Sequence, residues 1–539
     1  MISTGRLLLV VLGFLALDTA GARRPNIVYF MADDLGYGDV KCFGKEKSRA
    51  ETPSFDRLAN EGMMFTDAHA VASVCVPSRV AIMTGRYPWR FDRAERGGPW
   101  GFIGLQYQPE TFTLADLLKQ GGYTTGYVGK WHLGTRMTTT NSGIQTTNNV
   151  DYTKPLMIGP KDYGFDYSFI LPGSLDMFPY VFVRNNQFLG YVNKQRGWSA
   201  FNRVGPTEES FEDYKVLDTF STEAEQFIAR HAQDAKAGKP FFLYVALTSP
   251  HTPTSPSPKF AGKSRLGLYG DFLMETDDCL GRVMGALEKH GLDRNTLLVA
   301  TSDHGAASYA GNIRKATFAQ YKSMQRLGHY SSGIFRGFKF SIYEGGRRVP
   351  FIAKWPGVIQ PGTQSDRLIG LQDVFRTFAQ VSRQDLKDDQ GVDSISLIPL
   401  FGNRGAEATR KTMIQKSTRS WAIRKGGWKL CLCPGSGSIG RYGNAPVPDV
   451  AYKAAIEQFG GKPKSNDLFK APFVQLFDLH NDPTESNNLA GKRPDLVEEL
   501  LAIFDQQWAA GRSTPGPTQK NDRPGLNPLA GVPKFVLGL

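Results

Sequence analysis

Short apolar runs alternate with segments of helical periodicity along most of the 539-residue chain. The runs have the length of β-strands, and the intervening segments repeat apolar residues every three or four positions. Strands are predicted at residues 26–34, 123–129, 240–247, 296–303 and 348–357. Helices are predicted at residues 52–62, 111–122, 221–235 and 269–291. This alternation predicts an α/β fold with a large, mostly parallel (mixed) sheet sandwiched by helices.

The pattern changes at two places, which divides the chain into regions. Residues 135–215 are rich in loop-forming residues and are predicted to be an insert at the rim of a main domain, 23–404. Beyond it the pattern becomes antiparallel strands with tight turns and then a helix over 493–511, which predicts a smaller C-terminal α+β subdomain at 405–511. Residues 512–539 form a Pro-rich tail that is predicted to be extended.

The N-terminus, residues 1–22, has the pattern of a secretory signal peptide. Arg6 precedes an apolar run from Leu7 to Leu17, which is too short to span a bilayer, and small residues mark a cleavage point before residue 23. No later segment has the length and apolarity of a membrane anchor, and no Asn-x-Ser/Thr acceptor for glycosylation occurs. The sequence predicts an exported protein, periplasmic or secreted, from a bacterial host rather than a lysosomal enzyme.

The formal net charge of +13 is not altered by removal of the signal peptide, which carries one Arg and one Asp. An exported basic protein suggests a polyanionic substrate or surface, and a basic surface suited to solubility explains the charge equally well. No block of five or more Lys and Arg residues and no nucleic-acid-reading motif occurs. Nucleic acid is therefore not expected as a partner.

The five cysteines leave at least one thiol unpaired, and we assign that thiol to Cys75. The other four are Cys42, Cys279, Cys431 and Cys433. They allow two disulfides in three arrangements, or they stay reduced. Cys431 and Cys433 are two positions apart, so on a strand they face the same side and are not expected to pair with each other.

Acidic and basic side chains follow the predicted strands at the places where those strands end. They are Asp33, Asp34, Lys130, His132, His251, Asp303 and His304, and a later loop adds Lys339. Each has an ordinary structural explanation alone, such as a turn or a helix cap. In an open α/β sheet, however, the carboxyl ends of the strands are where ligands bind. The coincidence therefore predicts one site.

The residue types at these strand ends suit a metal ion beside an anion. Three carboxylates are hard oxygen donors, which fit Ca²⁺ or Mg²⁺ better than Zn²⁺. His304 is a less usual partner for such ions, so it either coordinates weakly or donates a hydrogen bond to the anion. Arg79, Lys130 and Lys339 would surround a tetrahedral anion and stabilise charge on its oxygens.

The stretch "SVCVPSRVAIMTGRYPWR", residues 73–90, carries a family resemblance. Its "CVPSRVAIMTGR" resembles the first signature of type I sulfatases, members of the alkaline phosphatase superfamily. "GYTTGYVGKWHLG" resembles their second signature, and "NIVYFMADD", "SPHTP" and "TSDHG" follow the family order. The resemblance runs from about residue 25 to 510 and is strongest for the arylsulfatase and N-acetylgalactosamine-6-sulfatase-like branch.

The resemblance implies that Cys75 is oxidised to Cα-formylglycine (3-oxoalanine) by a formylglycine-generating enzyme that reads the linear Cys-x-Pro-x-Arg segment. It implies a Ca²⁺ site, with Mg²⁺ as an alternative. The implied ligands are Asp33, Asp34, Cys75, Asp303 and His304. A hydroxyl of the hydrated aldehyde would attack sulfur, giving a covalent sulfo-enzyme, and the second hydroxyl would expel sulfate.

The same resemblance implies a role for each remaining site residue. Arg79 holds the modified side chain, and the helix that begins beside it directs its positive end at the anion. Asp303 assists deprotonation of the attacking hydroxyl, and Lys130 neutralises sulfate charge. His251 and Lys339 protonate the leaving alcohol, while His132 takes the proton from the second hydroxyl.

The implied function is hydrolysis of a sulfuric ester on a sulfated carbohydrate or an aryl sulfate. One alternative is a phosphonate monoester or phosphodiester hydrolase of the same superfamily, and another is an exported polyanion-binding protein without activity. Within the insert, Asp176 is a candidate to hydrogen-bond sugar hydroxyls. The aromatics of residues 173–185 either stack on sugar rings or pack the insert's own core.

Overall fold

The structure is a computed structural model that describes residues 23–198, 202–310, 320–402, 410–418, 420–433, 435–437, 474–522 and 526–529. The predicted signal peptide and, in the predicted tail, residues 523–525 and 530–539 lie outside these ranges. Within the described ranges, no helix has both the length and the apolarity needed to cross a membrane.

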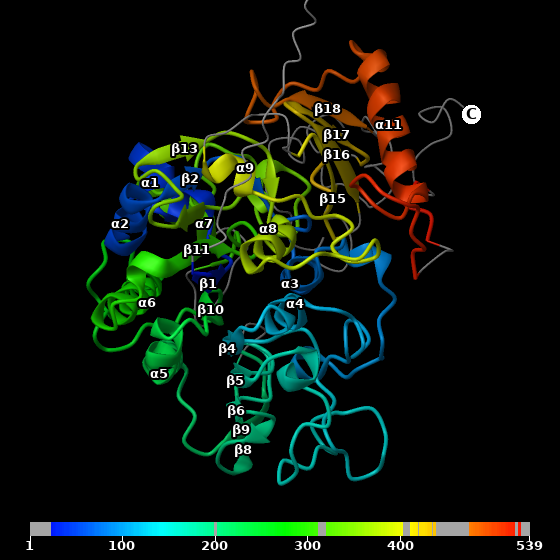
Figure 1. Cartoon of the computed structure of the whole chain (residues 1–539). Coiled ribbons are helices and arrows are strands. Elements are labelled where there is room, and N and C mark those ends of the chain that lie inside the picture. Colours follow the sequence, from blue (N-terminus) through cyan, green and yellow to red (C-terminus); the bar gives the residue numbers. More distant parts are fainter. Residues whose placement is uncertain are drawn as a thin grey trace, which may run out of the picture.

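The centre of the protein is a ten-stranded mixed sheet (Figure 1). Its strand order is β13-β2-β12-β11-β1-β10-β4-β5-β6-β7. The five neighbouring strands from β11 to β5 are parallel, and β12 pairs antiparallel with β11. The bounds are β1 Asn26–Asp33, β2 Met63–Phe65, β4 Thr124–Lys130, β5 Tyr167–Leu171, β6 Val183–Arg184, β7 Gln187–Phe188, β10 Phe241–Pro250, β11 Thr296–Ser302, β12 Phe351–Lys354 and β13 Thr363–Ser365. The predicted α/β sheet is confirmed.

Helices cover both faces of this sheet. In Figure 1, α2 Pro53–Glu61, α5 Val216–Lys236 and α6 Leu268–Lys289 lie on one side of the central strands. The other side carries α3 Cys75–Thr84, α4 Leu114–Gln120 and α8 Asp373–Ser382, which pack against one another. Shorter elements are α1 Lys41–Gly44, β3 Ala68–His69, β8 Val192–Arg196, β9 Gly205–Glu208, α7 Gln320–Arg326, β14 Ile369–Gly370 and α9 Ile398–Phe401.

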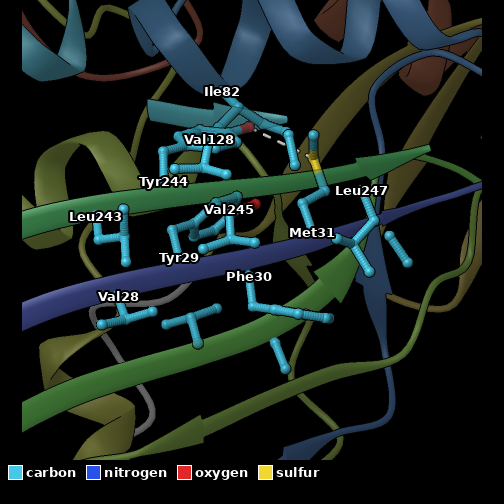
Figure 2. Packing of buried hydrophobic residues seen from close by; sticks show 14 of the residues in the cluster. Val28, Tyr29, Phe30, Met31, Ile82, Val128, Leu243, Tyr244, Val245 and Leu247 are labelled. Atoms are coloured by element: carbon cyan, nitrogen blue, oxygen red, sulfur yellow. Dashed lines mark hydrogen bonds between the residues drawn. The ribbon is translucent and has the colours of Figure 1, made fainter. Parts of the chain in front are cut away.

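Strand β1 lies at the middle of the core and is buried on both faces. Val28, Tyr29, Phe30 and Met31 have no exposed surface (Figure 2). Burial on both faces explains why the strand reads as a continuous apolar run rather than as an alternating one. The hydroxyl of Tyr244 on β10 contacts the sulfur of Met31 at 3.4 Å, which links the two strands across the sheet (Figure 2).

The C-terminal part forms a separate four-stranded antiparallel sheet, as predicted. Its strands are β15 Thr412–Lys416, β16 Trp421–Lys425, β17 Trp428–Cys431 and β18 Gln475–Asp478, in that order, and α11 Pro494–Ala509 packs against them (Figure 1). One apolar cluster joins this sheet to the main domain, because Val71 and Ala81 of the main domain pack with Ile414, Leu430 and Phe504.

The region 135–215 is more than the rim that the sequence predicts. It supplies β5, which pairs in parallel with β4, and then β6 and β7 at the same end of the sheet. The strand "YSFIL" of β5 is buried at all five positions. It is flanked by loop residues, so the sequence shows no alternation of apolar and polar positions that would predict a strand there. All five cysteines lie in the described part of the chain, and all are free thiols there.

Candidate active site

The parallel strands bring the predicted site residues to one edge of the sheet. β1 ends at Asp33, β4 ends at Lys130, and β11 is followed directly by Asp303 and His304. His251 follows the last residue of β10. Because β11, β1, β10 and β4 are neighbours in parallel register, their carboxyl ends meet at the same place.

Cys75 is the first residue of α3 and faces this edge. Its buried Sγ lies 3.5 Å from Oδ1 of Asp33, 3.2 Å from Nε2 of His304 and 3.6 Å from Nζ of Lys339. Val74 before it is extended, so the helix begins at the thiol and directs its first free N–H groups toward the site. Burial raises the pKa of the Cys75 thiol well above its usual range, although Lys130 and Lys339 oppose that effect.

Each of the three carboxylates has a cationic partner. Lys130 donates to Asp33 at 2.5 Å, and Lys339 donates to both oxygens of Asp34 at 2.8 and 3.0 Å. Arg79 donates through Nε and Nη2 to Oδ2 of Asp303 at 3.1 and 3.0 Å. All six side chains are buried. The three negative and three positive charges therefore compensate one another away from water.

These ion pairs keep Asp33 and Asp34 charged despite their burial. Burial alone would raise the pKa of Asp33, but Lys130, His251 and Arg79 hold that pKa well below its usual range. The pKa of Asp34 is also lowered: burial raises it, and Lys339 makes the largest contribution among the charges that lower it. Burial lowers the pKa of Lys339, and Asp34 more than reverses this, so the ammonium stays charged. The site thus holds charged oxygen donors at neutral pH.

The helix α3 explains how Arg79 reaches Asp303. Arg79 is four residues after Cys75, so both side chains lie on the same helix face. Its Nη1 also donates to the backbone carbonyl of Lys130 at 3.1 Å, and the hydroxyl of Tyr127 donates to that same carbonyl at 2.6 Å. These contacts fix the end of β4 against α3. Tyr127 was not predicted as a site residue because its position within an apolar strand gives no sign of this contact.

The three histidines occupy different positions. Nε2 of His304 lies 3.2 Å from Asp34, beside Cys75. His251 lies between two carboxylates, with Nε2 3.7 Å from Asp34 and Nδ1 3.8 Å from Asp176. The side chain of His132 makes no hydrogen bond or ion pair within the described ranges. Burial, with Lys130 and Arg79 nearby, lowers the pKa of His132 well below its usual range and keeps the ring neutral.

The donor set suits a hard divalent cation. The ligand atoms of Asp33, Cys75, Asp303 and His304 all lie within 4.8 Å of one another, and Asp34, Cys75 and His251 form an overlapping group. Charged carboxylate oxygens are the ligands that Ca²⁺ and Mg²⁺ prefer. A third group of ligand atoms within the same distance, Asp67, His69 and Glu344, lies outside this site, and Arg348 and Arg424 bind its carboxylates.

Asp176 lies next to the site through a contact that the sequence does not reveal. Arg203 donates to Oδ2 of Asp176 at 2.6 Å. The guanidinium of Arg203 also lies 3.4 Å from the centre of the Trp100 ring. Oδ1 of Asp176 is buried and has no hydrogen-bond partner among the residues that the structure describes. A buried carboxylate oxygen without a partner is costly, so it is available to a ligand hydroxyl.

The fold and the site together define a hydrolase of sulfuric esters, as comparison with known proteins shows. The family model described as "Sulfatase" matches residues 25–382, and the chain belongs to this family. The N-acetylgalactosamine-6-O-sulfatase of Bacteroides thetaiotaomicron is 32% identical over 522 residues, covering 90% of this chain and 93% of that protein. Rat N-acetylgalactosamine-6-sulfatase is 32% identical over 81% of this chain and 80% of its own length.

Solved structures agree with this assignment. One from Bacteroides thetaiotaomicron, described with the metabolism of multiple glycosaminoglycans, superposes with a TM-score of 0.74 at 31% identity, covering 90% of this chain and 99% of that one. A Pseudoalteromonas sulfatase at 22% identity has a TM-score of 0.65 and supports the fold alone. The predicted sulfatase resemblance and enzyme class are confirmed.

Proposed function

We propose that this protein removes sulfate from a sulfated carbohydrate, with aryl sulfates as the alternative substrate class, using formylglycine formed from Cys75 beside a bound Ca²⁺. The observation that carries the proposal is the contact of Cys75 Sγ with Asp33, His304 and Lys339 at the start of α3. The N-acetylgalactosamine-6-sulfatases of Bacteroides thetaiotaomicron and rat act, by name, on a sulfated amino sugar, which supports the carbohydrate class.

The burial of Cys75 supports modification before folding is complete. Its side chain is 3% exposed and its thiol pKa is raised well above the usual range, so the folded protein holds an unreactive thiol. An oxidising partner enzyme would need the segment "CVPSR" in extended form. In the mature site, Sγ marks the position of an oxygen substituent on the same Cβ. The hydrated aldehyde would supply two hydroxyls on one carbon, one to accept sulfate and one to expel it.

The proposed metal ligands are Asp33, Asp34, Asp303 and His304, together with the side chain at position 75. A bound Ca²⁺, or Mg²⁺, would lower the pKa of a hydroxyl and polarise sulfate oxygens. His304 is held by a contact of its Nδ1 with the carbonyl of Gly305 at 2.9 Å, which leaves Nε2 facing Cys75 and Asp34.

The remaining residues handle the anion and the protons. Lys130, Lys339 and the N-terminus of α3 bind sulfate, since all three present positive charge at Cys75. Asp303, fixed by Arg79, assists deprotonation of the nucleophile. His251 and Lys339 lie beside Asp34 and donate protons to the leaving alcohol. The lowered pKa of His132 keeps its ring neutral, which leaves an unprotonated nitrogen for its proposed role of accepting the proton as sulfate leaves.

The proposal is tested by measuring sulfate release from a panel of sulfated mono- and oligosaccharides, with 4-nitrophenyl sulfate and 4-nitrophenyl phosphate beside them. We expect Ca²⁺-dependent release from at least one sulfated sugar, and an intact mass of the tryptic peptide carrying residue 75 that matches the aldehyde. Turnover of the phosphate ester at a higher kcat/KM than every sulfate ester would overturn the sulfatase proposal in favour of the phosphoester alternative.

Asp176→Asn is expected to lower kcat/KM on the preferred sugar sulfate by about 10- to 100-fold, because the Oδ1 position, which has no hydrogen-bond partner among the described residues, would no longer accept a sugar hydroxyl. The amide keeps one oxygen for Arg203 and preserves the size of the side chain. Hydrolysis of 4-nitrophenyl sulfate, which lacks sugar hydroxyls, should change less than about threefold. Steady-state kinetics on both substrates make the comparison.

Asp166→Asn serves as the matched control, because Asp166 is a half-exposed carboxylate of the same region and pairs with Lys119 far along the sheet from Cys75. It should leave both activities unchanged. Equal losses on the sugar and the aryl ester in Asp176→Asn would show that Asp176 only supports the fold around His251.

A further inference from the structure

A separate cavity of about 830 Å³ lies between the main domain and the C-terminal sheet. The turn between β16 and β17, the first part of α11 and residues 366–368 line it. Its volume falls within the ~300–1,000 Å³ range of small-molecule sites. None of the described residues that line it belongs to the catalytic centre. We name this cavity the basic cleft.

The basic cleft carries an excess of positive charge. Six cationic side chains and three carboxylates line it. Two further buried carboxylates behind the lining, Asp373 and Glu344, bind Arg410 and Arg348, so the cations exceed the carboxylates by one when His480 is counted as neutral. The six are Arg348, Arg367, Arg410, Lys411, Arg424 and Lys425, and the three are Asp67, Asp366 and Glu499. The charged pairs of the catalytic centre balance, so they contribute nothing to the net charge of +13. The basic cleft contributes directly to it.

The floor of the basic cleft is held rigidly. Arg424 donates through Nη1 and Nη2 to the two oxygens of Asp67 at 2.9 and 3.1 Å, and Arg348 donates through Nε to Glu344 at 3.1 Å. Arg424 is 2% exposed, and its Nε has no hydrogen-bond partner among the described residues. A buried guanidinium N–H without a partner is costly, and a bound anion or a water would satisfy it.

The rim of the basic cleft holds cations that the fold does not use. Arg367 and Lys411 are exposed, and neither side chain has an ion pair or hydrogen bond within the described ranges. Between floor and rim, the half-buried indole of Trp428 provides an apolar wall. A sulfated sugar chain presents the complement of this arrangement, with anionic groups spaced along rings that have apolar faces.

We propose that the basic cleft is a second binding site for a sulfated glycan chain, which holds sugar units other than the one being desulfated. The choice of a sulfated glycan as ligand rests on the proposed function. Two segments connect the basic cleft to the catalytic centre, because 67–75 begins at Asp67 and ends at Cys75, and 339–348 begins at Lys339 and ends at Arg348. Eight or nine steps of chain span at most roughly 30 Å. A chain held in the cleft therefore stays near the centre, which raises its effective concentration there.

The test is the double charge reversal Arg367→Glu with Lys411→Glu, which alters exposed side chains only. The matched control is Lys239→Glu with Lys289→Glu, which makes the same change in net charge at exposed positions before β10 and at the end of α6. Binding of a fluorescently labelled chondroitin sulfate hexasaccharide is measured in a Cys75→Ala background, so that turnover does not interfere. Thermal unfolding verifies that each protein is folded.

We expect the double variant Arg367→Glu with Lys411→Glu, called the cleft reversal below, to weaken hexasaccharide binding by about tenfold or more. Binding by this variant should also depend less on salt concentration. The affinity of the control pair should stay within about twofold of the parent. In the active enzyme, the cleft reversal should raise KM on the sulfated polymer and leave kcat/KM on a monosaccharide sulfate unchanged. Equal weakening by both pairs would overturn the proposal, because it would indicate a long-range charge effect. Unchanged binding in the cleft reversal would overturn it too. Binding is measured without turnover, so failure of the sulfatase proposal would be seen separately.

Discussion

Replacing Cys75 by serine is expected to limit the protein to about one equivalent of desulfated product per chain. A serine hydroxyl at the start of α3 keeps the contacts with Asp33, His304 and Lys339 and accepts a sulfuryl group. It has no second hydroxyl on the same carbon, so nothing expels the transferred sulfate. The loss in steady-state kcat should be at least about 10³-fold, the scale on which removal of a covalent nucleophile acts.

The measurement is a rapid-mixing assay that separates the first turnover from later ones, with the peptide mass at position 75 confirming an unmodified serine. Cys75→Ala is the control, because it removes the nucleophile and should show neither a first turnover nor steady release. Sustained release of sulfate by a protein whose serine is unmodified would contradict a mechanism that needs both hydroxyls.

Much of the fold is readable from the sequence because strand burial leaves a direct pattern. "NIVYFMAD" and "FFLYVALTSP" are buried along their whole length, and such runs are recognisable without knowledge of their partners. Strand β5 escaped prediction because five apolar residues within a loop-rich region resemble a local core. Helix α8 was also not predicted, although its apolar residues face the core. No predicted strand lies directly before or after it, so the strand-helix alternation does not indicate a helix there.

The candidate site is predictable for a related reason. Asp33, Lys130 and Asp303 were identified because each follows an apolar run, and the parallel topology converts that shared property into proximity. Lys339 lies on an irregular loop rather than at a strand end, so the strand pattern does not place it beside the others, and its role is indicated by the family resemblance. The contacts that orient these groups, such as the hydroxyl of Tyr127 on the carbonyl of Lys130, depend on side-chain directions that no sequence pattern encodes. The basic cleft was unpredictable because it forms between segments as distant as residues 67 and 499.

The compensation of charge at the site bears on how its parts respond to substitution. The buried carboxylates of Asp33 and Asp34 remain ionised because nearby cations, above all Lys130 and Lys339, lower their pKa values. Removing one cation leaves the charge of its buried carboxylate without a counter-charge, and that charge then interacts with the neighbouring ion pairs. A cation that contacts two carboxylates therefore has the greater effect. Arg79 is such a cation, since its Nη2 lies 3.0 Å from Asp303 and 3.6 Å from Asp33.

Arg79→Lys is accordingly expected to lower kcat by about 10²- to 10³-fold per mole of formylglycine, comparable to the loss of one preorganised donor at a site of developing charge. Lysine retains the positive charge but offers a single nitrogen, so it cannot contact Asp303 through two donors and the carbonyl of Lys130 at once. Rates are measured on the preferred sulfate ester and divided by the modified fraction from the peptide mass, because Arg79 is also part of the segment read during maturation.

Arg86→Lys provides the matched control, since Arg86 belongs to the same signature but stacks over Phe91, with its guanidinium 4.3 Å from the ring centre, and contacts none of the catalytic carboxylates. Its kcat per modified chain should stay within about threefold of the parent, because only the stacking contact weakens. Retention of more than about a tenth of the parent kcat by Arg79→Lys, at equal modification, would contradict this account. It would show that Asp303 is positioned by the charge of Arg79 alone and does not need the two-donor contact or the contact with the carbonyl of Lys130.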